Sequence, residues 1–262
     1  MSAAVETEPV RVEHDGPVAT LTLDRARRRN PLSVATMRAL TAALHDVSAH
    51  PGVRVIVVAA EGPAFSAGHD LSEMVDRTLD EERLVFDVCT EMMTTLHAVG
   101  QPVIASVQGM AVAAGCQLAA ACDLVVAADT AVFGTPGVKI GLFCSTPMVA
   151  VTRAVGRKRA MQLLLTGETI DAATAADWGL VNVVVPPAEL AARTRALARQ
   201  VADASDVTLR IGKDAFYRQV DLPEDEAYAA MSETMAANAV TCDAQEGMSA
   251  FLAKRPPVWQ GR

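Results

Sequence analysis

Alternating and helically spaced apolar positions divide the first fifty residues into a hairpin and a helix. Apolar and polar side chains alternate in Val10–His14 and in Val18–Leu23, on either side of Asp15-Gly16-Pro17. Alternation around a turn rich in Gly and Pro predicts a β-hairpin. Ser33 then precedes apolar residues that recur every three or four positions to about His50, which predicts an N-capped amphipathic helix.

Three short apolar runs further along the chain lack this alternation, as strands covered on both faces do. They are Val53–Ala59, Pro102–Val107 and Asp123–Ala128. The stretch Leu79–Val99, between the first two runs, has helical spacing instead. Strand, loop and helix therefore recur, which predicts an α/β layered core in which loops at strand ends build the site.

The composition changes near residue 188 and predicts a helical C-terminal part of the same domain. From there to about Ala253 the chain is rich in Ala, Glu, Met and Arg, with turn signals only near Asp203 and Asp221. We expect residues 1–187 to form the core with the site. Residues 188–262 are expected to form a helical lid or an oligomer interface.

Composition and charge narrow the class of protein. The 262 residues are 51% hydrophobic, enough for one sizeable core. The formal net charge of −8 argues against a nucleic-acid partner, because phosphate binding needs a basic surface. The start of the chain lacks the pattern of a secretory signal, and no apolar stretch is long enough to cross a bilayer. The expected location is therefore the cytoplasm, without membrane insertion.

The cysteines and histidines do not predict a metal site. No CxxC pair occurs, the cysteines are odd in number, and the histidines are scattered without ligand spacing. We expect most of the cysteines to be buried thiols. The residues concerned are Cys89, Cys116, Cys122, Cys144 and Cys242, and His14, His45, His50, His69 and His97.

Two segments place small residues on turns beside predicted strands. They are Ala64–Leu71, with the sequence AFSAGHDL, and Gly109–Asp123, with the sequence GMAVAAGCQLAAACD. Small residues let a ligand oxygen approach the backbone, and helix N-termini leave N–H donors unsatisfied. Two such loops together can form an oxyanion hole that favours enolate-like intermediates.

These two segments, with Phe133–Leu142 and Ala154–Val181, resemble the crotonase superfamily, the enoyl-CoA hydratases and isomerases. The resemblance extends over nearly the whole chain. It implies an α/β fold in which ββα units form a spiral, followed by a helical oligomerisation region. The motifs G-H-D-L, A-A-G-C-Q-L and G-L-F-C-S-T-P are similar to those of the enoyl-CoA hydratase domain-containing protein 3 subgroup.

In that family, two peptide N–H groups hold the thioester oxygen of an acyl-CoA. Matching motifs imply that these donors are the backbone N–H groups of His69 and Ala114. Coenzyme A enters as part of the substrate, and no further cofactor is implied. The residues expected to contact it are Arg27, Arg28, Arg29, Ala67, His69, Asp70, Leu71 and Ala114. Three arginines suit phosphates, although such a cluster is also typical of a solvated face. Ser72 stands where several hydratases carry a lysine that binds CoA.

Both catalytic glutamates of the family's hydratases are replaced. Hydration requires activation of water at Cβ and delivery of a proton to Cα, which those hydratases perform with two glutamates. By motif, the first becomes Gln117 and the second becomes Gly137. Glutamine can orient a water molecule but does not exchange a proton usefully near neutral pH, and glycine does neither.

Other polar residues of these motifs are candidates to replace the two missing glutamates. The imidazole of His69 titrates near neutrality, but a structural position for its ring is favoured because its backbone is assigned to the thioester. Asp70 is expected to fix its loop through bonds to backbone N–H groups, and Glu73 to be solvated. Cys144 and its neighbours Ser145 and Thr146 have nothing beside them in sequence that would activate a nucleophile.

Three functions stay open. The first is an enzyme of the enoyl-CoA hydratase type, a lyase of fatty acid metabolism that stabilises an enolate. The second is a non-catalytic binder of CoA esters or a regulatory subunit. The third is an enzyme of a different reaction: an isomerase, or a thioester hydrolase or decarboxylase that uses a water molecule held by Gln117. The pocket around the segment Leu71–Val99 is expected to select the acyl group.

The resemblance also implies homotrimers or dimers of trimers built through the helical tail. Phe251 and Lys254 are then expected near the nucleotide end of a neighbour's CoA.

Overall fold

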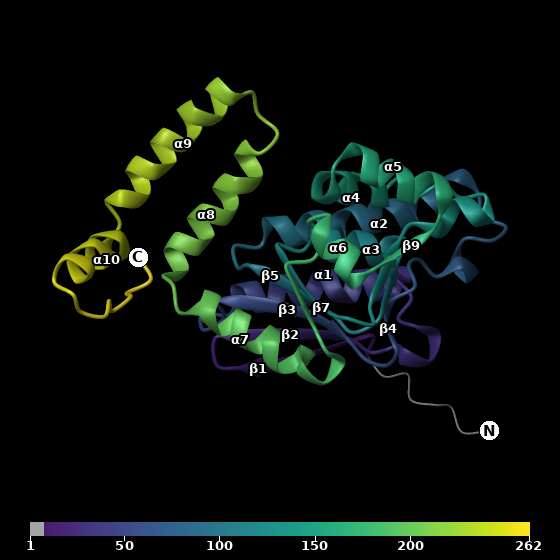
Figure 1. Cartoon of the computed structure of the whole chain (residues 1–262), viewed down its shortest axis with the longest axis horizontal. Coiled ribbons are helices and arrows are strands. Elements are labelled where there is room, and N and C mark those ends of the chain that lie inside the picture. The colour runs from purple at the N-terminus through teal and green to yellow at the C-terminus, as the bar shows by residue number, and fades with distance from the viewer. Residues whose placement is uncertain (1–7) are drawn as a thin grey trace.

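A six-stranded sheet, with strand order β1-β2-β3-β5-β7-β10, runs through the molecule in the computed structural model, which describes residues 8–262 (Figure 1). The antiparallel hairpin of β1 and β2 forms one edge, and every other neighbouring pair is parallel. The strands are β1 (Val10–Asp15), β2 (Val18–Leu23), β3 (Val55–Ala60), β5 (Val103–Val107), β7 (Leu124–Ala128) and β10 (Val183–Val185). The predicted hairpin and all three predicted buried strands are present.

A second sheet of four short strands lies beside the first, with the order β4-β6-β8-β9. Its strands are β4 (Ala64–Ser66), β6 (Met110–Val112), β8 (Val132–Gly134) and β9 (Thr169–Asp171). Each of the pairs β3-β4, β5-β6 and β7-β8 gives one strand to each sheet, and a helix follows each pair. The chain therefore repeats a ββα unit, as expected for a crotonase-like spiral.

Helices pack around the two sheets and close the main core. They are α1 (Val34–Ala49), α2 (Leu79–Ala98), α3 (Ala114–Ala121), α4 (Pro147–Val155), α5 (Arg157–Thr166) and α6 (Ala172–Asp177). Short 3-10 helices occur at Ala26–Arg28, Leu71–Glu73, Pro136–Ile140 and Pro187–Glu189. The side chain of Ser33 accepts a hydrogen bond from Thr36 N–H, so the predicted N-cap of α1 is confirmed.

The C-terminal region is helical, with α7 (Leu190–Ala202), α8 (Asp206–Gln219), α9 (Glu224–Ala239) and α10 (Cys242–Leu252). Helix α7 packs on the six-stranded sheet, whereas α8 to α10 extend away from the core (Figure 1). The predicted turns near Asp203 and Asp221 are present. A third break, at Val240-Thr241, is not signalled by Gly or Pro, and Thr241 caps α10 there.

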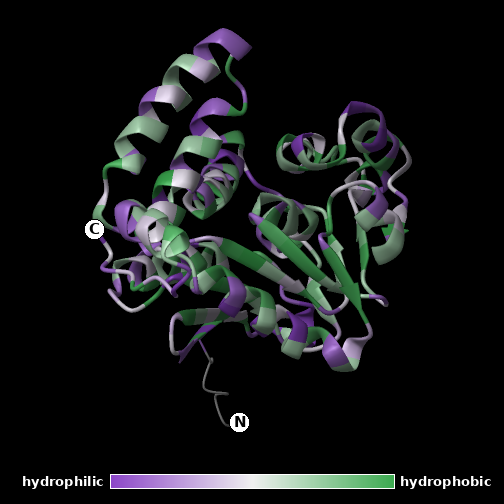
Figure 2. Cartoon of the chain, turned by 60° about the vertical axis from the view of Figure 1, so that its left-hand side comes forward, coloured by the Kyte–Doolittle hydropathy of each residue, from purple (hydrophilic) through white to green (hydrophobic). Residues whose placement is uncertain are grey.

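A buried polar cluster anchors α8 to the core. The ammonium group of Lys213 lies 2.8 Å from the carboxylate of Asp123 and also donates to the carbonyl of Leu96 at 2.7 Å. Asp123 accepts a 2.6 Å hydrogen bond from the hydroxyl of Tyr217. Figure 2 shows that the central strands are strongly apolar, whereas polar and apolar residues are mixed along the extended helices.

No helix in residues 8–262 is long and apolar enough to cross a membrane. The predicted absence of a secretory signal concerns the start of the chain, and residues 1–7 lie outside the described residues.

Candidate functional site

A cavity of about 410 Å³ opens where the two glycine-containing loops meet. Six of the residues expected to bind the acyl-CoA line it, namely Arg28, Ala67, His69, Asp70, Leu71 and Ala114. The segment 136–147 supplies most of the remaining lining. The structure therefore brings together residues that are more than forty positions apart in the sequence.

The first loop is held by backbone hydrogen bonds on both sides of Gly68. Ala67 N–H donates to the carbonyl of Arg29 at 3.0 Å, and Leu32 N–H donates to the carbonyl of Gly68 at 2.8 Å. Gly68 has φ +92°, a conformation that favours glycine. The N–H of His69, which follows Gly68, donates to no backbone acceptor of a turn, loop or helix cap in residues 8–262.

The second loop presents the N-terminus of α3. Ala113 has φ +50°, which is unusual for a residue with a side chain, and its N–H donates to the carbonyl of Gly134 at 2.9 Å. This turn starts the helix at Ala114, whose N–H has no intrahelical acceptor. A Cβ built on Gly68 would lie 3.2 Å from the Ala114 nitrogen, so the first loop, at the residue before His69, lies close to the donor of the second.

The ring of His69 is fixed against the wall behind the first loop. Its Nδ1 lies 3.3 Å from the carbonyl of Leu32, and its plane meets the ring of Phe86 edge-on at 5.5 Å. Because a carbonyl only accepts, this contact puts the proton of the neutral imidazole on Nδ1. Burial lowers the pKa of His69, so the ring is neutral at pH 7 and Nε2 carries a lone pair.

Asp70 is bonded within its loop. Its carboxylate accepts from Ser72 N–H at 3.1 Å and from the Ser72 hydroxyl at 2.6 Å, and it lies 3.0 Å from the guanidinium of Arg28. Glu73, which was expected to be solvated, is half-buried and is also bonded to the protein. Its carboxylate accepts from Val34 N–H at 2.8 Å, because that group is one of the unsatisfied donors at the start of α1.

The three consecutive arginines do not share one position. All three are exposed, but only Arg28 lines the cavity. A second cation, Lys139, lies in the lining on the opposite segment and was missed by the sequence analysis. The signal was present in the matching motif Phe133–Leu142, which contains this lysine.

Neither position of the family's glutamates presents a side chain to the cavity. Gln117 is buried and outside the lining, and its amide oxygen lies 3.9 Å from the sulfur of Cys89. Gly137 lines the cavity, but a Cβ built on it would lie 2.1 Å from the carbonyl oxygen of Leu142. The chain folds back on Gly137 here, since Leu142 N–H donates to its carbonyl at 3.0 Å.

Cys144 occupies the space next to Gly137. Its sulfur would lie 2.8 Å from a Cβ on that glycine, and the residue lines the cavity. Burial raises the pKa of the Cys144 thiol above its ordinary value, so the thiol is protonated at neutral pH. This is not the environment of an activated nucleophile.

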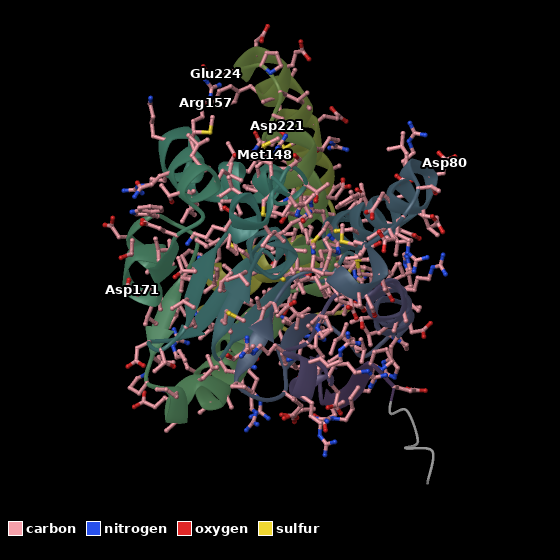
Figure 3. All side chains as sticks on the ribbon, turned by 90° about the vertical axis from the view of Figure 1, so that its right-hand side faces the viewer. Asp80, Met148, Arg157, Asp171, Asp221 and Glu224 are labelled. Atoms are coloured by element: carbon pink, nitrogen blue, oxygen red, sulfur yellow. The ribbon has the colours of Figure 1, made fainter. Side chains whose placement is uncertain are left out.

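The lining differs from the expected acyl pocket. Only Leu71 of the segment Leu71–Val99 lines the cavity, and apolar side chains of residues 136–147 form the opposite wall. The partly exposed Ile140, Leu142 and Phe143 belong to this wall. Helix α4 continues from it, with Met148 at its start (Figure 3). No group of three or more His, Cys, Asp and Glu in residues 8–262 is arranged to hold a metal ion.

A spiral of ββα units, with two helix-adjacent loops meeting at one cavity, defines a crotonase-fold protein. The enoyl-CoA hydratase/isomerase family matches residues 13–262, and the chain belongs to that family. The chain is 44% identical to human enoyl-CoA hydratase domain-containing protein 3, mitochondrial, over 97% of this chain and 84% of the relative.

Two solved structures are similar over nearly the whole chain. A Mycobacterium smegmatis enoyl-CoA hydratase has a TM-score of 0.94 at 43% identity, covering 96% of this chain and 98% of that one. The human domain-containing protein 3 has a TM-score of 0.93 at 42% identity, covering 96% of this chain and 100% of that one. The subgroup expected from the motifs is thus confirmed.

Proposed function

We propose that this protein binds acyl-CoA thioesters and polarises their carbonyl group with the backbone N–H groups of His69 and Ala114. The observation that carries the proposal is the meeting of the two loops at the cavity, with both N–H groups free of turn, loop and cap acceptors. Preorganised donors of this kind stabilise an enolate oxygen by about 3 to 4 kcal/mol each. The reaction proposed first is hydration of an enoyl-CoA, a lyase reaction of fatty acid metabolism.

A second candidate is a CoA-ester binder without turnover. The packing around Gly137 favours it, because the site of one family glutamate has no room for a side chain. Isomerisation, thioester hydrolysis and decarboxylation are further reactions that a polarised thioester permits. Coenzyme A arrives as part of the substrate, and the proposal requires no other cofactor.

Calorimetric titration and a turnover assay separate these candidates. We expect a non-hydrolysable ketone analogue of butyryl-CoA, in which a CH2 group replaces the thioester sulfur, to bind more tightly than free CoA, because only the analogue has a carbonyl oxygen for the donors. Hydration of crotonyl-CoA is then followed as loss of the enoyl absorbance. Binding with turnover supports the hydratase, and binding without turnover supports the second candidate. No difference between the analogue and free CoA would contradict the proposed oxyanion hole.

Arg28 is expected to bind phosphate groups of CoA at the cavity, assisted by Lys139. Charge-assisted hydrogen bonds are worth about 1.5 to 3 kcal/mol, so Arg28→Gln should weaken acyl-CoA binding about tenfold or more. The effect should shrink at high salt. Arg27→Gln is the matched control, because Arg27 is exposed and outside the lining. Equal losses in both variants would indicate a general surface charge effect instead.

The C-terminal helices are proposed to form the contacts of a homotrimer or a dimer of trimers. In support, α9 has no buried residue, and Phe251 and Leu252 at the end of α10 are 83% and 82% exposed. Phe251 and Lys254 are then proposed near the CoA of a neighbouring subunit. Size-exclusion chromatography coupled to light scattering measures the mass of the assembly. The cytoplasmic location also stays a prediction, and the human relative and its mouse, rat, zebrafish and frog counterparts carry the word mitochondrial in their names.

A further inference from the structure

Helix α2 turns one face toward the site residues. Phe86 meets the ring of His69, and Cys89 meets the amide of Gln117. Residues three and four positions apart share a helix face, so Glu82 lies on this same face, one turn before Phe86. Helix geometry therefore places Glu82 on the face of α2 that carries Phe86, one turn further from Cys89, although Glu82 is not among the residues that line the cavity.

The other carboxylates near this wall are already engaged. Asp70 bonds Arg28 and Ser72, Glu73 bonds the start of α1, and Glu81 closes a capping box with Thr78. Asp80 is 87% exposed and pairs with Arg83. In Figure 3 it projects from the outer end of α2, away from the body of the molecule. None of these four groups is free to serve the acyl group.

Glu82 differs from them because one of its carboxylate oxygens is enclosed without a bonding partner. The Oε2 atom is buried and receives no hydrogen bond, and no other carboxylate oxygen in residues 8–262 combines these two properties. The Nε2 atom of His69 is buried and unpartnered in the same way. Buried polar atoms are normally paired. Two acceptors associated with one helix face therefore suit a donor such as a water molecule or the hydroxyl group of an acyl chain.

We propose that Glu82 supplies the proton-transfer carboxylate that Gln117 and Gly137 cannot provide. This inference rests on the proposed function, because it requires a thioester held at His69 and Ala114. Cα and Cβ of the acyl group then extend past His69 toward α2. The carboxylate accepts one proton from water while the water oxygen forms a bond to Cβ, and the electron pair of the Cα=Cβ bond moves to the thioester oxygen. The enolate then returns that pair, Cα takes the proton from Glu82, and the carboxylate is regenerated.

The substitution Glu82→Gln tests the proposal because it keeps the size of the side chain and removes its proton transfer. Asp87→Asn is the control, since Asp87 also lies on α2 but is exposed. Three quantities are measured for each variant: helical content by circular dichroism, affinity for the ketone analogue of butyryl-CoA, and the hydration rate of crotonyl-CoA. Exchange of the Cα protons of butyryl-CoA in heavy water, followed by NMR, reports proton transfer without hydration.

We expect Glu82→Gln to lower hydration and exchange at least 100-fold with affinity within threefold of the unmodified protein, while Asp87→Asn changes neither. Glu82→Asp should retain part of the activity, because it keeps the carboxylate. Hydration and exchange within twofold of the unmodified protein in Glu82→Gln would overturn the proposal. So would an unmodified protein that binds the analogue but neither hydrates nor exchanges. A protein that fails to bind the analogue contradicts the proposed function itself, which the affinity measurement shows separately.

Discussion

Replacing Gly137 with glutamate, the change that restores the family's second acid, will destabilise the protein and will not increase its turnover. The Cβ of any side chain at this position would lie 2.1 Å from the carbonyl oxygen of Leu142. That oxygen belongs to the backbone and cannot rotate away as a flexible side chain can. Overpacking of this kind costs about 1 to 3 kcal/mol. Urea unfolding should therefore show a lower midpoint for Gly137→Glu.

Gly137→Ala separates the steric effect from the charge. It adds only the Cβ, so it should lose a similar free energy of unfolding. Shortening Cys144 to alanine in addition should give only a small recovery, because the Leu142 carbonyl is the nearer atom. A Gly137→Glu variant as stable as the unmodified protein, with faster hydration of crotonyl-CoA, would contradict this description of the loop.

The absence of the second acid and the conformation of the loop are thus linked through the glycine at position 137. A glycine at position 137 allows residues 138–142 to fold back, and this brings Leu142 and Cys144 to the cavity wall. The wall gains apolar surface where a hydratase of the family would present a carboxylate. Any proton transfer must therefore come from another group, and in our proposal that group is Glu82 on α2.

The sequence predicts the large sheet well but not the small one. The run Val53–Ala59 is continuous and β-branched, and strand β3 follows it closely, beginning at Val55 and ending at Ala60. The strands of the second sheet, such as β4 and β8, have three residues each. A run of three residues is too short to show an alternation, and its pairing depends on strands far away in the chain. Only the resemblance to a known family supplied the ββα repeat.

The site was predicted to the extent that it depends on local backbone. Gly68 and the small residues before α3 mark places where two loops approach closely, and sequence motifs reveal them. Lys139 and Glu82 were missed, because their relation to the site arises from contacts across the fold. The same reason applies to Gln117, whose seclusion beside Cys89 depends on how α2 packs.

Replacing Gly115 with alanine should disable the site by separating the two loops. A Cβ at this position would lie 2.4 Å from the carbonyl oxygen of Ser66 and 2.8 Å from its Cβ. Ser66 is fully buried and supports the first loop, since its hydroxyl donates to the carbonyl of Asn30 at 2.8 Å and accepts from Gly68 N–H at 3.2 Å. The helix carrying Ala114 must therefore move away from His69, and affinity for the butyryl-CoA analogue should fall at least tenfold.

Gly212→Ala is the matched control for this substitution. Gly212 lies within α8, and a Cβ there would meet no atom within 4 Å. Alanine is favoured over glycine inside a helix by about 0.5 to 1 kcal/mol, so this variant should be slightly more stable and bind as before. Calorimetry and urea unfolding on both variants distinguish the effects. The clash at Gly115 is with the backbone of β4, which cannot move as a side chain can. A Gly115→Ala variant that binds the analogue normally would therefore contradict the proposal that both N–H groups, of His69 and of Ala114, must be held in place to bind the thioester.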